Sequence, residues 1–299
     1  MNKKAFSLIE LSVVILIIGI LVAGVTQGSR LVNRMRLSAA RAITSSSPVN
    51  SIRDIVGWWE TTLEQSFNGT EPEEDSDGDT GGITTWYDIN PQSTVKNNAT
   101  SPATTNNPGY TASGSINNLP TLNFNGSDHY LHFDGTSLAN SNYSIFVVEQ
   151  RTSGTGDYRY MIASSNGSGI TNQLLQVGYR NSSTITWGQF ANDFNVSVAS
   201  YNVPIARIHS LVFGSALPTA KSYYLNGAVQ TLNNTYGSAV ASQGLTSYTN
   251  ATFGLYGTDQ NVYYQGNIGE IIIFNRALKN EERDAIEDYL GRKWGIRVL

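Results

Sequence analysis

The strongest constraint on this chain is an apolar stretch near its amino terminus. The sequence begins MNKKAFSLIELSVVILIIGILVAG, and between Phe6 and Val25 the one charged residue is Glu10. The roughly twenty residues of this stretch span about 30 Å as a helix at about 1.5 Å per residue, which matches the hydrocarbon core of a bilayer. Lys3 and Lys4 precede it, so the amino terminus is expected on the cytoplasmic side. The stretch therefore predicts a single-pass membrane helix.

The helical pattern continues beyond the apolar stretch. Apolar residues recur every four positions, at Leu31, Met35, Ala39 and Ile43. Most of the arginines in this region lie off that line, which is typical of an amphipathic helix. We therefore expect one helix over residues 6–43. An ordinary secretory signal would be cleaved near Ala23, and the continued periodicity argues against that alternative.

Glu10 needs a separate explanation. A charged side chain at the centre of a membrane helix costs about 2.5–3.5 kcal/mol on insertion scales, so a simple anchor would be better without one. A buried carboxylate becomes tolerable when a cation pairs with it. The position of Glu10 therefore predicts a partner for its charge.

The stretch KKAFSLIELSVVILIIGILVAG resembles the class III leader and first helix of type IV prepilins and type II secretion pseudopilins. The resemblance implies that residues 1–5 are a leader, and that prepilin peptidase cuts between Ala5 and Phe6 and methylates the new amine. It also implies that Glu10 neutralises the terminal amine of a neighbouring subunit during assembly. Ala5 stands where the family usually has glycine. The proline of many pilins is absent, which leaves pilin and pseudopilin both open.

Composition and charge exclude several functions. The 299 residues include no cysteine, which rules out thiol catalysis and thiolate zinc sites. Residues 1–43 carry six basic side chains and one acidic side chain, a net charge of +5. Because the whole chain has a net charge of −4, the other residues together carry −9. We expect no nucleic-acid binding from so acidic a globular part.

The remainder of the chain reads as one β-rich domain. The polar run TSSSPVN at 44–50 predicts a linker or hinge. Residues 51–299 then alternate short β-rich segments with Gly, Asn and Ser turns, as in a sandwich or jelly roll. The last segment, NRALKNEERDAIEDYLGRKWGI, predicts one terminal helix capped by Asn280 and ended by Gly295.

A second resemblance covers this domain. The segments ITTWYDI, NNLPTLNFNGSDHYLHFDG, YSIFVVEQ, YYLNG and GEIIIFNRALKNEERDAIEDYLGRKWGI are similar to laminin-G-like domains of the concanavalin A-like lectin and glucanase superfamily. The implied fold is mainly β: an antiparallel β-sandwich of the concanavalin A-like jelly-roll type, with one carboxy-terminal α-helix after it. That superfamily includes enzymes, lectins and scaffolds, so the fold leaves the function open.

The expected strand that begins at Glu270 is the one candidate for hydrolase chemistry. Retaining glycosidases need two carboxylates about 5–5.5 Å apart, and the glucanases of this superfamily place carboxylates at alternate strand positions. Here Ile272 stands where the second carboxylate should lie on the same face, and the segment ends in the amide Asn275. The strand therefore argues against hydrolysis, and no catalytic residue is predicted.

Metal sites were sought among the histidines and aspartates. His129 and His132 are three apart, so on a strand they point to opposite faces. His209 has no acidic neighbour in the sequence and is interpreted as a packed side chain. An acidic run holds the remaining candidates for a calcium site, Asp75, Asp77 and Asp79. We favour a solvated loop there, and expect no other cofactor.

These observations predict a pilin-like structural subunit of a type IV pilus that displays a lectin-like sandwich for surface adhesion or glycan binding. The alternative is a pseudopilin of a type II secretion system, and a tethered polysaccharide hydrolase comes third. The expected partners are prepilin peptidase, other pilin subunits, the inner membrane before assembly, and a carbohydrate ligand. The expected location is the bacterial inner membrane, then an extracellular pilus or a periplasmic pseudopilus. Whether the subunit is major or minor stays open.

Overall fold

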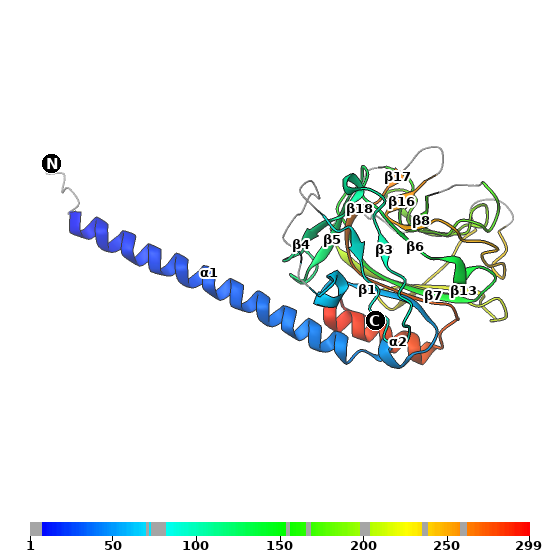
Figure 1. Cartoon of the computed structure of the whole chain (residues 1–299), viewed down its shortest axis with the longest axis horizontal. Helices are drawn as coiled ribbons and strands as arrows, with labels where there is room; N and C mark the ends of the chain where they lie inside the picture. Colours follow the sequence, from blue (N-terminus) through cyan, green and yellow to red (C-terminus); the bar gives the residue numbers. More distant parts are fainter. Residues whose placement is uncertain are drawn as a thin grey trace.

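The protein consists of a long helix that projects from a β-sandwich (Figure 1). The helix α1 (Leu8–Ser45) is continuous, and it ends two residues beyond the end expected from the sequence. The computed structural model describes residues 8–69, 72, 82–153, 156–165, 169–197, 204–234, 239–257 and 262–299.

The first sheet lies in the middle of three layers. Its strands follow the order β14-β13-β12-β7-β18-β5-β4, and β1 also pairs with β18, all antiparallel. Its long strands are buried along nearly their whole length, as expected for strands covered on both faces. The strands are β1 (Ile55–Glu60), β4 (Gly109–Thr111), β5 (Thr121–Asn125), β7 (Tyr143–Arg151), β12 (Ala206–Phe213), β13 (Lys221–Leu225), β14 (Ala228–Gln230) and β18 (Gln265–Phe274).

The second sheet covers one face of the first. Its order is β11-β10-β9-β8-β15-β6-β3-β2, and a small hairpin of β16 and β17 lies beside β8. The strands are β2 (Thr85–Trp86), β3 (Ala99–Thr100), β6 (Leu131–Phe133), β8 (Arg159–Ser164), β9 (Gln176–Tyr179), β10 (Thr184–Gly188), β11 (Phe194–Ser197), β15 (Ala251–Phe253), β16 (Leu255–Tyr256) and β17 (Val262–Tyr263). The expected antiparallel sandwich is therefore confirmed.

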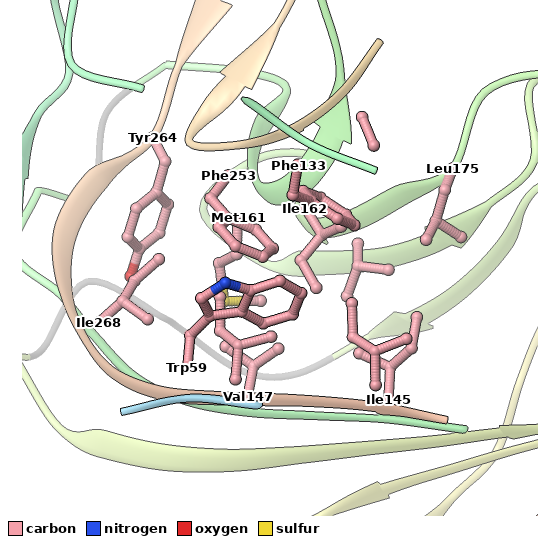
Figure 2. Packing of buried hydrophobic residues seen from close by; sticks show 14 of the residues in the cluster. Trp59, Phe133, Ile145, Val147, Met161, Ile162, Leu175, Phe253, Tyr264 and Ile268 are labelled. Atoms are coloured by element: carbon pink, nitrogen blue, oxygen red, sulfur yellow. The ribbon is translucent and has the colours of Figure 1, made fainter. Parts of the chain in front are cut away.

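The main core lies between the two sheets and centres on Trp59 (Figure 2). The Trp59 ring meets Phe253 at 5.0 Å and Phe133 at 5.5 Å between centroids, both edge to face. A Cβ atom at Gly57 would lie 2.2 Å from the Trp59 ring, so any residue other than glycine at this position would clash with the ring. The tryptophan thus fixes the spacing of the sheets.

A second core lies between the outer face of the first sheet and the helix α2 (Asn280–Trp294). Alternation along β7 explains both cores: Ile145 and Val147 face Trp59, whereas Phe146 and Val148 pack beneath the helix. The layers are therefore helix, first sheet and second sheet.

The ends of α2 test the predicted caps. Gly295 ends the helix with a left-handed φ of 66°, as expected. The predicted cap at Asn280 is wrong by one residue, because Glu282 Oε2 accepts the Lys279 backbone N–H at 2.9 Å and so makes Lys279 the N-cap.

The segment between α1 and the sandwich is packed. The sequence predicts a linker over 44–50, but a short 3-10 helix, η1 (Pro48–Ser51), begins within it. Val49 is fully buried in the second core, and its N–H donates to Ser47 Oγ at 3.2 Å. These contacts make the junction a packed corner and leave no free hinge. The other short 3-10 helices are η2 (Glu64–Phe67), η3 (Thr104–Asn106) and η4 (Thr136–Leu138).

Candidate functional site

The first half of α1 is apolar and exposed. Within the described part of the chain, one helix is long and apolar enough to cross a membrane, with a mean hydropathy of 2.3 and none of its apolar window buried. Its large apolar side chains from Leu8 to Val25 are 47–85% exposed. A stripe of this size is stable in a bilayer or against other helices and is unfavourable in water.

The last turns of α1 are fixed to the sandwich. Arg41 Nε donates to Thr62 O at 2.7 Å, and Arg41 also pairs with Glu64 Oε1 at 3.0 Å. Ala40 and Thr44 are 2% and 1% exposed. The helix is therefore free at one end and docked at the other.

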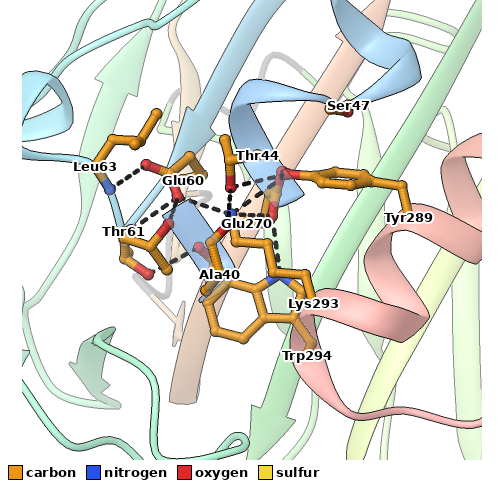
Figure 3. Close-up of polar contacts among 12 residues, drawn as sticks. Ala40, Thr44, Ser47, Glu60, Thr61, Leu63, Glu270, Tyr289, Lys293 and Trp294 are labelled. Carbon is orange, nitrogen blue, oxygen red and sulfur yellow. Dashed lines mark hydrogen bonds and ion pairs between the residues drawn. The ribbon is translucent and has the colours of Figure 1, made fainter. Parts of the chain in front are cut away.

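Beneath the docked end lies a buried ion cluster, which we define as Glu60, Glu270 and Lys293 (Figure 3). Glu60 on β1 and Glu270 on β18 face each other in the strand register. Two like charges directly opposite each other destabilise a sheet. Lys293 Nζ on α2 removes that conflict, because it lies 2.7 Å from Glu60 Oε2 and 2.9 Å from Glu270 Oε2.

Neutral donors complete the shell around Glu270. Its Oε1 accepts from Trp58 Nε1 and from the Tyr289 hydroxyl, each at 2.7 Å. Its Oε2 also accepts from Trp294 Nε1 at 2.8 Å. All three ions of the cluster are 0% exposed, so each of these bonds offsets hydration that the carboxylate has lost.

The turn after β1 completes the shell around Glu60. The backbone N–H groups of Thr62 and Leu63 donate at 2.8 and 2.7 Å, and the Ser66 hydroxyl donates at 2.8 Å. Burial alone would raise the pKa of Glu60, but the charge of Lys293 and these hydrogen bonds outweigh it and lower that pKa. Glu60 is therefore held as the carboxylate.

The cluster reaches α1 through Tyr289 and Thr44. The Tyr289 hydroxyl lies 3.5 Å from Thr44 Oγ1, and Thr44 in turn donates to Ala40 O at 3.0 Å. The same network thus contacts α1, β1, β18 and α2 (Figure 3). It fixes the direction in which α1 leaves the sandwich.

Several residues singled out in the sequence lie outside this site. Glu10 belongs to α1, although its side-chain surroundings are not described. Glu270, the first carboxylate of the hydrolase pattern, is held in the ion cluster, and Ile272 is fully buried. The remaining candidates fall outside the described residues: Ala5, Phe6, Asp75, Asp77 and Asp79.

His209 is a packed side chain, as interpreted from the sequence, because it is 0% exposed, but it also has a charged partner. Its Nε2 lies 2.9 Å from Glu149 Oε1, so it does have an acidic neighbour. No local pattern indicates this pair, because it depends on which strands lie side by side, and the two residues are 60 positions apart on β7 and β12. Tyr179 also donates to Glu149, at 2.5 Å, and the whole group is buried between the sheets.

The other two histidines show no shared metal site. His129 Nδ1 lies 3.1 Å from Asn123 O, and His132 is half-buried on β6. Across the residues that the structure describes, no group of three or more His, Asp or Glu side chains is arranged to hold a metal ion.

Comparison with known proteins supports the two-part organisation. Residues 1–26 match the family model of the prokaryotic N-terminal methylation motif, as expected from the resemblance to prepilins. The comparison with curated proteins gave no match. The chain thus combines a prepilin-type methylation segment with an antiparallel β-sandwich.

Solved structures similar to the chain are distant in sequence. Trypanosoma rangeli sialidase aligns at 11% identity and a TM-score of 0.47, over 81% of this chain and 33% of the sialidase, so the chain spans about a third of that enzyme. Domain 4 of AbnA, a GH43 extracellular arabinanase from Geobacillus stearothermophilus, in complex with arabinotriose, aligns at 12% identity and a TM-score of 0.45. The alignment covers 79% of this chain and 98% of that domain. The Ruminococcus gnavus IT-sialidase CBM40 bound to alpha2,3 sialyllactose aligns at 14% identity and a TM-score of 0.41. The alignment covers 56% of this chain and 95% of the CBM40 chain.

The ion cluster predicts a large effect of removing its cation. Lys293→Met is expected to lower the free energy of unfolding by about 3–5 kcal/mol, because two buried carboxylates lose their shared partner. The measurement is urea unfolding of the detergent-solubilised chain, followed by circular dichroism. Arg292→Met, at the exposed neighbouring position of α2, is the matched control and should change stability by less than about 1 kcal/mol. An equally small change for Lys293→Met would contradict the role given to the cluster.

The lowered pKa of Glu60 predicts acid sensitivity. Because this pKa lies below its ordinary value of 4.5, Glu60 contributes stability above that pH, and this contribution is lost as pH falls through the folded-state pKa. Glu60→Gln should therefore be less stable at neutral pH and lose stability less steeply in acid. The comparison of unfolding free energies across this range isolates Glu60, since all other groups are shared. Parallel acid profiles for the two proteins would show that folding does not lower the pKa of Glu60.

Proposed function

We propose that this protein is a pilin-like structural subunit of a type IV pilus that displays its β-sandwich for surface adhesion or glycan binding. One observation carries the proposal: the methylation motif begins a helix whose apolar half is exposed while its far end is fixed to the sandwich. Polymerisation through the helix would bury the apolar stripe and leave the sandwich outside. The role is structural and adhesive, without catalysis.

Processing precedes assembly in this account. The subunit first sits in the bacterial inner membrane with its amino terminus in the cytoplasm and its sandwich on the opposite side. Prepilin peptidase then cuts between Ala5 and Phe6 and methylates the new amine of Phe6. The removal of Lys3 and Lys4 with the leader leaves the new amine and Glu10 as the charges of the apolar stretch.

Assembly requires a partner for Glu10. Helices that stack with a small axial offset place the terminal amine of one subunit beside the carboxylate of another. The pair then exchanges a charge that is costly in the membrane for a salt bridge in the filament interior. This gives each added subunit a defined axial position.

The second candidate is a pseudopilin of a type II secretion system. It shares the leader, the helix and the exposed apolar stripe, and the unbroken course of α1 to Ser45 without a proline is compatible with both. Labelling intact cells with an antibody to the sandwich separates them. Labelled surface filaments support the pilus, whereas assemblies confined to the periplasm support the pseudopilus.

The assembly proposal predicts the effect of Glu10→Ala. This variant should insert into the membrane and be processed at Phe6, because neither step uses the carboxylate. Filament yield should fall sharply, since the neighbouring amine is left unpaired in a low-dielectric interior. Electron microscopy measures the yield, and mass spectrometry of the amino terminus checks processing. Glu281→Ala, on the exposed surface of α2, is the control. Filaments of Glu10→Ala at normal yield would refute the pairing.

A further inference from the structure

A cavity of about 290 Å³ lies on the outer face of the second sheet. Val177 and Tyr179 on β9 point into the main core. Neighbouring residues of a strand point to opposite faces, so Gln176, which precedes Val177, faces outward. The strands β8 and β16, which contribute Tyr160 and Tyr256 to the cavity, lie across the sandwich from α1 and α2 (Figure 1), with the first sheet between the second sheet and α2. We call it the tyrosine cavity and define it by Tyr158, Tyr160, Tyr256, Gln176, Arg180 and Asp193.

Three tyrosines form one wall of the cavity. Tyr160 and Tyr256 meet edge to face at 5.2 Å between ring centroids, and Tyr158 lies 6.2 Å from Tyr256. Tyr158 is half-buried and lines the cavity, and the Arg180 guanidinium lies over its ring at 5.3 Å from the centroid. Tyrosine combines an apolar ring with a polar tip, which suits a ligand that has both C–H faces and hydroxyl groups.

Polar atoms without partners gather at the same place. Among the described residues, Gln176 Oε1 and Asp193 Oδ1 are buried and meet no donor at good hydrogen-bond geometry, although the Asp193 carboxylate also lies near the Gln189 backbone N–H. The Tyr160 hydroxyl, by contrast, has Thr186 as a partner. A Cβ atom at Gly188 would lie 2.4 Å from Asp193 Oδ1 and 2.6 Å from Gln176 Oε1, so both acceptors lie over that one glycine. Buried polar atoms of native proteins are nearly always satisfied, and a cluster of exceptions needs a reason.

The charge in the cavity is already balanced. Arg180 Nη1 pairs with Asp193 Oδ2 at 3.4 Å, which leaves the other carboxylate oxygen of this lining residue as an acceptor without a cation. An anionic ligand would approach that oxygen and be repelled. A neutral ligand with hydroxyl donors would satisfy it.

The backbone around the cavity is strained. Tyr158, Phe190 and Ala191 line it, and all three have left-handed φ angles, of 61°, 48° and 55°. Such angles are unfavourable for residues other than glycine, and they concentrate where a particular shape is required for binding. The strain therefore gives a second, independent sign that this surface has been shaped for a ligand.

We propose that the tyrosine cavity binds one ring of a neutral, hydroxyl-rich saccharide. The apolar face of the sugar packs against Tyr158, while its hydroxyls donate to Gln176 Oε1 and Asp193 Oδ1. The cavity lies near the lower end of the volumes of small-molecule sites, about 300–1,000 Å³, which suits a single sugar ring. This inference rests on the proposed display of the sandwich and adds the position and the ligand class.

The test is saturation-transfer NMR on the full chain in a detergent that carries no sugar headgroup. The probes are glucose, galactose, mannose and arabinose, with galacturonic acid as the acidic match of galactose. We expect saturation transfer to at least one neutral sugar, and weaker transfer to galacturonate than to galactose. No transfer to any of the four neutral sugars, or a preference for the acid, would overturn the proposal.

Two variants locate the binding. Tyr158→Ala removes the exposed ring, and Gln176→Leu removes an acceptor at nearly constant volume, so that the fold is retained. Each should weaken binding about tenfold, the factor equivalent to ~1.4 kcal/mol. Tyr130→Ala is the control, because Tyr130 is also half-buried in a ring pair, with Tyr263 at 6.1 Å, but lies outside the cavity. Unchanged binding in both cavity variants would place the sugar elsewhere and refute the inference.

Filament assembly distinguishes this proposal from the proposed function. Tyr158→Ala and Gln176→Leu should form filaments at normal yield, because the cavity lies opposite α1. Saccharide binding by a wild-type chain that forms no filament would support the cavity and contradict the pilus. Filaments that bind none of the neutral sugars would support the pilus and contradict the cavity.

Discussion

The structure depends on one buried cation. Lys293 lies between Glu60 and Glu270, which face each other across two neighbouring strands of the first sheet. Without it, two carboxylates would share a site with 0% exposure, and desolvation would disfavour both charges. Because the lysine comes from α2, this requirement ties the terminal helix to the sheet. Trp58, Tyr289 and Trp294 then have to be donors, which explains polar-tipped aromatic residues where a plain core would use aliphatic ones.

The same constraint fixes α1. Its last turns lie on the layer that the cluster organises, where Thr44 contacts Tyr289 and Arg41 binds the turn after β1. The packed corner at Val49 removes the slack that a flexible linker would give. A helix attached in this way would transmit force to the sandwich directly, which is what the proposed filament role requires. The outer face of the second sheet lies across the first sheet from the helix layer, and it carries the proposed tyrosine cavity.

Sequence patterns predicted the elements better than the contacts between them. The apolar stretch, the four-residue repeat after it and the capping of α2 at Gly295 are local signals, and each led to the correct element. The roles of Glu270 and His209 could not be found in this way, because their partners Glu60 and Glu149 lie 210 and 60 residues away. Strand order and register decide such pairs, and the sequence alone determines neither. The tyrosine cavity could not be predicted from the sequence for the same reason: Tyr158, Gln176 and Asp193 come together only once β8, β9 and β10 are adjacent.

The central claim is that α1 and the sandwich move as one rigid unit. The chain has no native cysteine, so spin labels can be placed at Arg36→Cys on α1 and Val95→Cys on the sandwich, both exposed positions. Double electron–electron resonance on this doubly labelled chain in detergent measures the distribution of distances between them. The account predicts a single narrow distribution that broadens when Lys293→Met is added. A broad distribution in the chain with Lys293 intact would contradict it.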